Sequence, residues 1–93
     1  MIFNNSFSYK HTPYQGNQLP VSVIVNFASD GRFIPIYFKY IGEEEAMTFK
    51  IDGIQSTRDK PDCIIFFCYI IQNDIRQQIS LIFKFKECRW MLG

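Results

Sequence analysis

Three cysteines have the widest chemical range of any residues in this chain, because a thiolate can attack an electrophile, bind a metal or form a disulfide. Their positions, Cys63, Cys68 and Cys88, match neither the spacing of a zinc site nor the even count of a disulfide framework. Two of them stand in an apolar run, where free cysteine behaves as a small hydrophobic residue. We therefore expect buried, unreactive thiols in a reducing compartment, and no metal site.

The other groups able to perform acid–base or nucleophilic chemistry are scattered. His11 is the only histidine, and no serine or cysteine lies in a nucleophile motif beside a partner base. Glu43, Glu44 and Glu45 are consecutive, so on a turn or strand their carboxylates diverge and do not meet at one metal or substrate. The five glycines are isolated and form no phosphate-binding loop. These patterns predict a protein without catalytic residues or a cofactor.

Basic side chains gather on two segments that we expect to be strands, and aromatic residues lie among them. Rings beside cations can stack nucleic-acid bases, as they do in barrels that bind single strands. Lysines on exposed strands more often prevent sheet edges from pairing. Weak nucleic-acid binding is therefore the alternative function. Its contact residues would be Arg32, Lys39, Lys84, Lys86 and Arg89.

One small domain must position all of these side chains. The chain has 93 residues, of which 47% are hydrophobic, 17% aromatic and 20% charged, and its formal net charge is +1. A domain of this length buries roughly 60% to 65% of the surface that its unfolded chain exposes. A charge near zero creates no overall field that attracts nucleic acid or an anionic membrane. Because no signal peptide and no run of about 20 apolar residues is present, we expect a cytoplasmic protein without membrane contact.

The first half of the chain predicts an arm followed by a hairpin. Residues 1–19 form an irregular arm with, at most, a short strand near Phe7–Lys10, and residues 20–93 form a single β-domain. Val21–Phe27 alternates between apolar and polar residues, and Asp30-Gly31 favours a tight turn into a second strand, Arg32–Tyr40. Pro35 has no N–H, so it belongs at an edge, beside a bulge, or with its nitrogen facing away from the neighbouring strand.

The second half predicts three further strands with one long loop. A strand follows the glutamates, since Met47, Phe49 and Ile51 alternate with polar residues, although a helix starting at the glutamates is an alternative. The remaining segments are a loop at Gln55–Asp62, a central strand at Cys63–Ile71, a turn at Gln72–Asp74, and a strand at Gln77–Lys86 that bends at a bulge near Lys86-Glu87. Together they predict an all-β meander of five to six antiparallel strands, bent into a small SH3- or Sm-like barrel or half-barrel.

The central strand has more apolar surface than one small core can accept. Both of its faces are apolar, and large exposed apolar patches are rare on monomers. Either the aromatic arm or a second molecule must cover the outer set. We therefore predict an interaction or regulatory accessory module that binds a second copy as a homodimer, or another protein. The predicted interaction surface is Ile64, Phe66 and Ile70.

Two short stretches resemble part of a known family. Ile34-Pro35-Ile36, followed by Thr48-Phe49-Lys50-Ile51-Asp52-Gly53-Ile54, is similar to a fragment of the WYL-type regulatory domains, although Gly53 stands where that pattern favours arginine. The resemblance implies the topology of an Sm-like barrel. Glu87-Cys88-Arg89-Trp90, taken with the second stretch, also resembles small bacterial proteins of unknown function, a resemblance that implies no activity.

Overall fold

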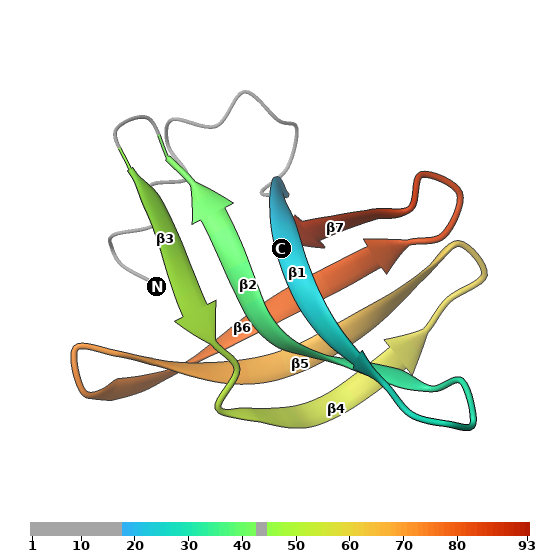
Figure 1. Cartoon of the computed structure of the whole chain (residues 1–93), viewed down its shortest axis with the longest axis horizontal. Coiled ribbons are helices and arrows are strands. Elements are labelled where there is room, and N and C mark those ends of the chain that lie inside the picture. The colour runs from blue at the N-terminus through green and yellow to red at the C-terminus, as the bar shows by residue number, and fades with distance from the viewer. Residues whose placement is uncertain (1–17, 43–44) are drawn as a thin grey trace.

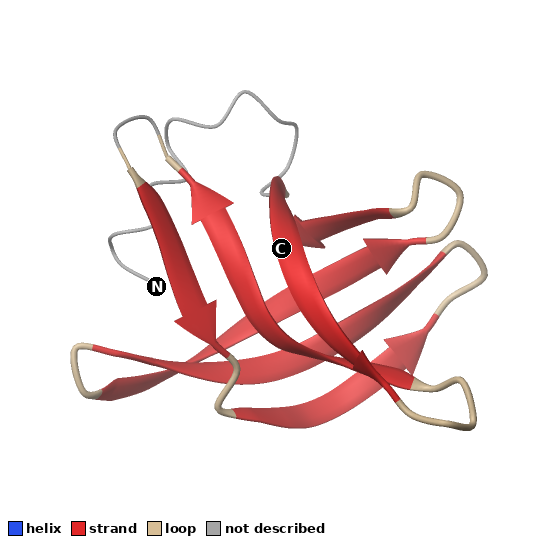
Figure 2. Ribbon diagram, in the orientation of Figure 1, coloured by secondary structure: helices blue, strands red, loops and turns tan. Residues whose placement is uncertain are grey.

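Seven antiparallel strands make up the secondary structure of the described residues, which are 18–42 and 45–93 of the computed structural model (Figures 1 and 2). The strands are β1 (Leu19–Phe27), β2 (Phe33–Ile41), β3 (Ala46–Lys50), β4 (Gly53–Asp59), β5 (Cys63–Gln72), β6 (Ile75–Lys84) and β7 (Arg89–Leu92). They form one curled sheet in the order β3-β2-β1-β7-β6-β5-β4. The predicted all-β half-barrel is confirmed, with seven strands in place of five or six. The predicted arm strand and His11 lie outside the described residues.

The sheet curls because β1 is shared between its two halves. Residues 19–21 of β1 pair with β7, whereas residues 22–27 pair with β2 on the opposite side. In Figure 1, β1, β2 and β3 therefore cross β4, β5, β6 and β7 at a large angle. The two halves face each other across the core, as in orthogonally packed sheets.

A two-residue corner closes one side of the half-barrel. β3 and β4 lie at opposite edges of the sheet, yet only Ile51 and Asp52 separate them in the sequence. The Ile51 amide donates to the Ile36 carbonyl of β2 (2.9 Å), and the Asp52 amide donates to the Tyr69 carbonyl of β5 (2.7 Å). The chain thus passes from one edge of the sheet to the other with both residues hydrogen-bonded.

The two predicted tight turns are confirmed. Gly31 has a φ of 92°, which glycine adopts without a steric penalty, and the turn containing it joins β1 to β2. Asn73 and Asp74 both have positive φ, 54° and 64°, as the primed turn of a two-residue hairpin between β5 and β6 requires. Pro35 lies beside a bulge in β2, one of its three predicted settings, because Ile24 pairs with Tyr37 and Val25 with Pro35, which leaves Ile36 without a partner in β1.

Two predictions of local structure were wrong, and the helix alternative also fails because residues 46–50 form β3. The predicted loop at Gln55–Asp62 is largely β4, an edge strand whose last five residues are all exposed. Such a strand lacks apolar alternation because neither of its faces is buried, and its backbone pairing with β5 holds it. The predicted bulge near Lys86-Glu87 is a hairpin turn in which Cys88 has a φ of 52°. Positive φ is uncommon at cysteine, so the residue type gives no sequence signal for this turn.

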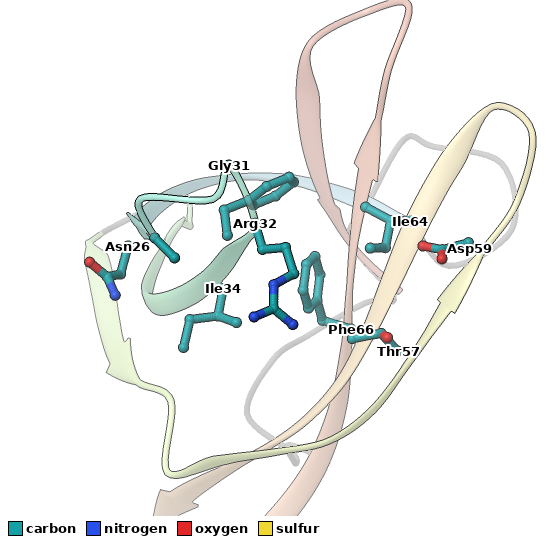
Figure 3. A pocket seen from close by; sticks show the side chains of 10 residues that line it. Asn26, Gly31, Arg32, Ile34, Thr57, Asp59, Ile64 and Phe66 are labelled. Atoms are coloured by element: carbon teal, nitrogen blue, oxygen red, sulfur yellow. The ribbon is translucent and has the colours of Figure 1, made fainter.

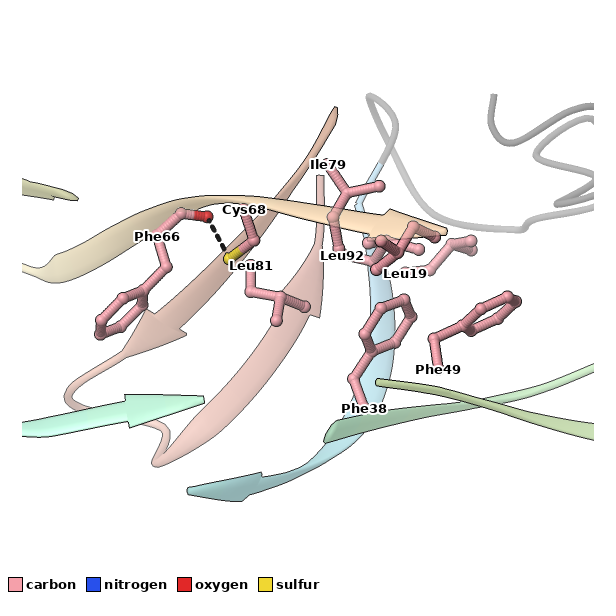
Figure 4. Close-up of a cluster of buried hydrophobic side chains, with 9 residues drawn as sticks. Leu19, Phe38, Phe49, Phe66, Cys68, Ile79, Leu81 and Leu92 are labelled. Atoms are coloured by element: carbon pink, nitrogen blue, oxygen red, sulfur yellow. Dashed lines mark hydrogen bonds between the residues drawn. The ribbon is translucent and has the colours of Figure 1, made fainter. Parts of the chain in front are cut away.

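The inner face of the sheet carries a buried core and, continuous with it, a group of aromatic rings that is partly exposed. Around the β3–β4 corner, side chains that are at most 8% exposed form the corner cluster: Phe38, Phe49, Cys68, Ile70 and Ile79 (Figure 4). Phe38 and Phe49 stack with their ring centroids 5.1 Å apart. Away from the corner, contacting rings form the aromatic cluster: Phe27, Phe33, Phe66, Phe83, Phe85 and Trp90.

Candidate functional site

A cleft of about 610 Å³ separates the β1–β2 hairpin from the β4–β5 hairpin (Figure 3). It lies on the side of the half-barrel away from the corner, where β2 and β4 diverge. Figure 3 shows Asn26, Arg32 and Ile34 on one wall, and Thr57, Asp59, Ile64 and Phe66 on the other. A volume of this size falls within the range of ligand-binding clefts.

Both walls of the cleft carry backbone N–H and C=O groups with which no neighbouring strand of the described chain pairs. β3 pairs with β2 only from Tyr37 onward, and the last bond on that edge is the one from Ile51 to Ile36. In an antiparallel strand, every second residue turns its N–H and C=O to the same edge. A register shift between Pro35 and Tyr37 interrupts this alternation, and the bond from the Ala28 amide to the Arg32 carbonyl (2.8 Å) shows that Arg32 and Ile34 face β1. The free N–H and C=O groups on the outer edge of β2 therefore belong to Phe33. Within residues 18–42 and 45–93 no strand pairs with this position on that side.

The facing edge of β4 is open in the same way. The Lys60 amide donates to Cys63 in β5 (2.8 Å), so the preceding residue that faces β5 is Arg58, and Thr57 and Asp59 face the free edge. β4 is the last strand of the sheet in the described part of the chain. Phe33, Thr57 and Asp59 all line the cleft. The cleft thus has main-chain donors and acceptors on both sides.

Phe33 and Phe66 of the aromatic cluster line the cleft, and the cluster as a whole reaches solvent. Phe33 contacts Phe66, Phe83 and Trp90 with ring centroids 5.7, 5.8 and 6.2 Å apart. Phe66 is 1% exposed, whereas Phe27, which packs on Phe33 at 5.3 Å, is 67% exposed. The cluster is therefore buried at one end and presents an aromatic surface at the other.

Opposite charges lie at the rim. Arg32 belongs to the β1–β2 turn and Asp59 ends β4, so they approach the cleft from different walls. The Arg32 guanidinium donates to Asp30 (2.8 Å), with side chains 86% and 50% exposed. An ion pair so exposed contributes little to stability and leaves the guanidinium accessible to a ligand.

The three thiols are free, and two of them are buried as predicted. Burial raises the pKa of the Cys68 thiol to about 12, and burial with the nearby Asp62 carboxylate raises the pKa of Cys63. Both are therefore protonated, and weak nucleophiles, at neutral pH. The prediction was wrong for Cys88, which is exposed because the β6–β7 turn presents it to solvent. Among the described residues, no three histidine, cysteine, aspartate or glutamate side chains gather as a metal site.

The structure places Phe66 and Ile70 of the predicted interaction surface in the main core, 1% and 0% exposed. Ile64 is half-buried and packs against the same core. Their side chains contact neighbouring strands, so they do not form an exposed surface. The alternate set on β5 occupies the opposite face, where Cys63 clusters with Ile82 and Met91, and Ile65 packs against them.

Of the five predicted nucleic-acid contacts, three come together. Lys39 and Arg89 line one hollow, and Arg89 lies directly opposite Lys84 in the β6–β7 pair. Lys86 is in the adjoining turn, whereas Arg32 belongs to the separate cleft. The structure therefore brings most of this set to one region.

Phe33, Thr57 and Asp59 were not predicted as site residues. Their relevant groups are backbone N–H and C=O, which every residue other than proline carries. The only signal that could have located them is the prediction of β4 as an unpaired edge strand, and its sequence lacks the alternation that identifies half-buried strands.

Comparisons with known proteins add no assignment. No family model, no curated protein and no solved structure matches this chain. A membrane-spanning helix of sufficient length and apolar character is absent from residues 18–42 and 45–93.

Proposed function

We propose that this domain is a non-enzymatic interaction module that binds an extended segment of a partner protein in the cleft between β2 and β4. One observation carries the proposal. Two facing strands, β2 at Phe33 and β4 at Thr57 and Asp59, present unpaired main-chain groups across an apolar base. An added strand matches such an arrangement because its own backbone offers donors and acceptors on both edges.

The side chains around the cleft support an extended peptide as the ligand. Residues of an added strand point alternately inward and outward. Inward residues would meet Phe33, Ile64 and Phe66, which favours large apolar side chains at every second position. Arg32 and Asp59 at the two rims would favour charged residues beyond that core.

The edges are partly protected against unselective pairing. β4 carries a bulge between Ile54 and Ser56 and ends with Arg58 and Asp59. Bulges and charges of this kind are how natural edge strands avoid aggregation. The cleft is therefore suited to binding one specific partner and not to pairing with any exposed strand. The free thiols Cys63 and Cys68 favour a reducing compartment such as the cytoplasm.

Peptide selection with edge variants tests the proposal. Decapeptides selected from a random library on the immobilised full chain are measured against the wild type, Thr57→Pro and Thr57→Val. Proline removes the N–H that faces the cleft, at an edge position where proline is tolerated, whereas valine removes only the hydroxyl. We expect Thr57→Pro to weaken binding about tenfold or more, the loss of roughly one hydrogen bond to a buried partner, and Thr57→Val to bind as the wild type does.

The same peptides should change the amide NMR signals of Phe33 and Thr57 and slow their hydrogen exchange. Thermal unfolding of Thr57→Pro shows whether the variant is folded. A library that yields no binder, or binders insensitive to Thr57→Pro with the Phe33 amide unchanged, would overturn the proposal. Light scattering over a concentration series tests whether the occupant of the cleft is instead a second copy of this chain. A dimer that Thr57→Pro dissociates would identify the second copy as the occupant.

A further inference from the structure

The outer face of the sheet carries a line of cations that begins on β2 and crosses β1. Lys39 lies opposite Ser22 of β1. On the other side of β1, Pro20 pairs with Met91 and Val21 with Trp90, so the next position, Ser22, is level with Arg89. Lys39, Ser22 and Arg89 line one hollow of about 430 Å³. The two cations therefore lie on either side of one small side chain.

The line continues across the other half of the sheet. Arg89 pairs with Lys84, and Lys84 pairs with Cys63. The Lys60 amide donates to the Cys63 carbonyl (2.8 Å), which places Lys60 beyond Cys63. The Lys60 and Lys84 charges both act on the Cys63 thiol, lowering its pKa against the larger opposing effects of burial and Asp62. We call Lys39, Arg89, Lys84 and Lys60 the basic row.

These four cations have no carboxylate partner among the described residues. The two ion pairs found there join Arg32 to Asp30 and Arg76 to Asp52, and both lie elsewhere. Neighbouring strands are about 4.8 Å apart, so the row extends over about 24 Å of surface. Four unpaired charges in a line of this length match a chain of negative charges better than they match a single small anion.

The same face offers a ring next to the row. Phe67 lies between Ser80 of β6 and Ser56 of β4, so no large side chain flanks it on either neighbouring strand. Arg58, opposite Ile65, lies on this face between the row and Phe67. A basic track with an aromatic ring beside it is the arrangement that holds single-stranded nucleic acid. A flexible single strand can also follow the curl of the sheet, which a rigid duplex cannot.

We propose that the basic row binds the phosphate backbone of single-stranded nucleic acid. This site lies on the outer face, whereas Arg32 and the cleft between β2 and β4 lie apart from it. It does not depend on the proposed peptide binding, because neither its residues nor its test involves Phe33 or Thr57.

Fluorescence anisotropy of a labelled 15-nucleotide thymidine oligomer at 50 and 200 mM salt tests the proposal on the full chain. Four phosphate contacts predict a slope of about −2.8 in log affinity against log salt, a loss of about 50-fold over this range. Lys84→Gln/Arg89→Gln should reduce that loss to about sevenfold, because two contacts remain. The control Arg32→Gln/Arg76→Gln removes the same charge away from the row and should keep the wild-type slope.

Three results would overturn the proposal: no binding at 50 mM salt, a flat salt response, or equal weakening by both double variants, which would indicate net charge alone. Polyglutamate and a 15-base-pair duplex serve as competitors. Displacement of the oligomer by polyglutamate at equal charge, or tighter binding of the duplex, would also reject a single-stranded ligand. Lys86 lies in the adjoining turn, so Lys86→Gln should weaken binding of the oligomer less than Lys84→Gln does.

Discussion

The corner and the cleft lie at the two sides of one half-barrel. The two edges of the sheet are joined at the corner and left apart at the cleft. At the corner, Ile51 and Asp52 hydrogen-bond to β2 and β5, and the corner cluster is almost fully buried. At the cleft, the same two edges diverge, and the aromatic cluster runs from a buried Phe66 to an exposed Phe27. The difference suggests that stability is concentrated at the corner, while the cleft retains groups that are available for binding.

The largest effect should come from shortening a ring in the corner cluster. Phe38→Ala removes a side chain that is 1% exposed and stacked on Phe49, and it should lower the free energy of unfolding by about 3 to 5 kcal/mol. Phe27→Ala, at the exposed end of the aromatic cluster, should change it by less than about 1 kcal/mol. Urea unfolding measures both. Equal losses would mean that the two clusters are equally important to stability.

A pH titration should give the second largest effect. The pKa of Cys68 is raised from 9.0 to about 12 by burial, so the folded state retains a proton that the unfolded state loses. The stabilisation is complete below pH 9 and is lost as the pH rises toward 12. Between pH 9 and 10.5 this thiol should cost about 2 kcal/mol of stability.

Cys68→Ala isolates that contribution, because other groups titrate in the same range. Its unfolding free energy should fall less steeply above pH 9 than that of the wild type, whereas the exposed Cys88→Ala should follow the wild type. Parallel curves for the wild type and Cys68→Ala would contradict a dry environment around the corner cluster.

Gly31→Ala should destabilise the cleft side by about 1 to 2 kcal/mol. The φ of Gly31 is 92°, and an added Cβ would meet no atom within 4 Å, so the cost is backbone strain alone. Hydrogen exchange should become faster in the β1–β2 hairpin, while Ile51 and Asp52 remain unchanged. Faster exchange at the corner as well would show that the two sides unfold together.

The smallest effect should come from an ion pair at the corner. Arg76 donates to Asp52 (3.0 Å) and lies 3.9 Å from the centre of the Tyr69 ring. Both side chains of the ion pair are partly exposed, so Arg76→Ala should cost about 1 kcal/mol, including the ring contact. Arg32→Ala, whose ion pair is at the cleft, should cost close to zero. Thermal unfolding at two salt concentrations compares them.

Sequence patterns predicted the tight turns and the central strand better than they predicted the cleft. The residue types at Gly31 and at Asn73-Asp74 indicate turns, and the apolar run of β5 indicates a central strand. Because β5 is apolar on both faces, its alternation could not decide which set faces the core, and Phe66 and Ile70 were assigned to the outside. Only the opposing half of the sheet decides this.

The cleft could not be predicted for a different reason. It results from two strands that diverge, and an absent neighbour has no sequence signal. β4 is exposed along most of its length and looks like a loop, and Cys88 adopts a positive φ that its residue type does not indicate. The residues of the basic row were mostly identified, but their alignment depends on the pairing of β1 with β7.

That pairing also has a consequence for how the chain folds. Of the six strand pairings in the described chain, five join strands that are adjacent in sequence. The sixth joins Leu19–Val21 to Trp90–Leu92, across almost the whole domain. Hairpins form in microseconds, whereas closing a long loop must first overcome its entropy. The docking of β1 on β7 should therefore be the last and slowest step, and a ribosome must release nearly the entire chain before it can occur.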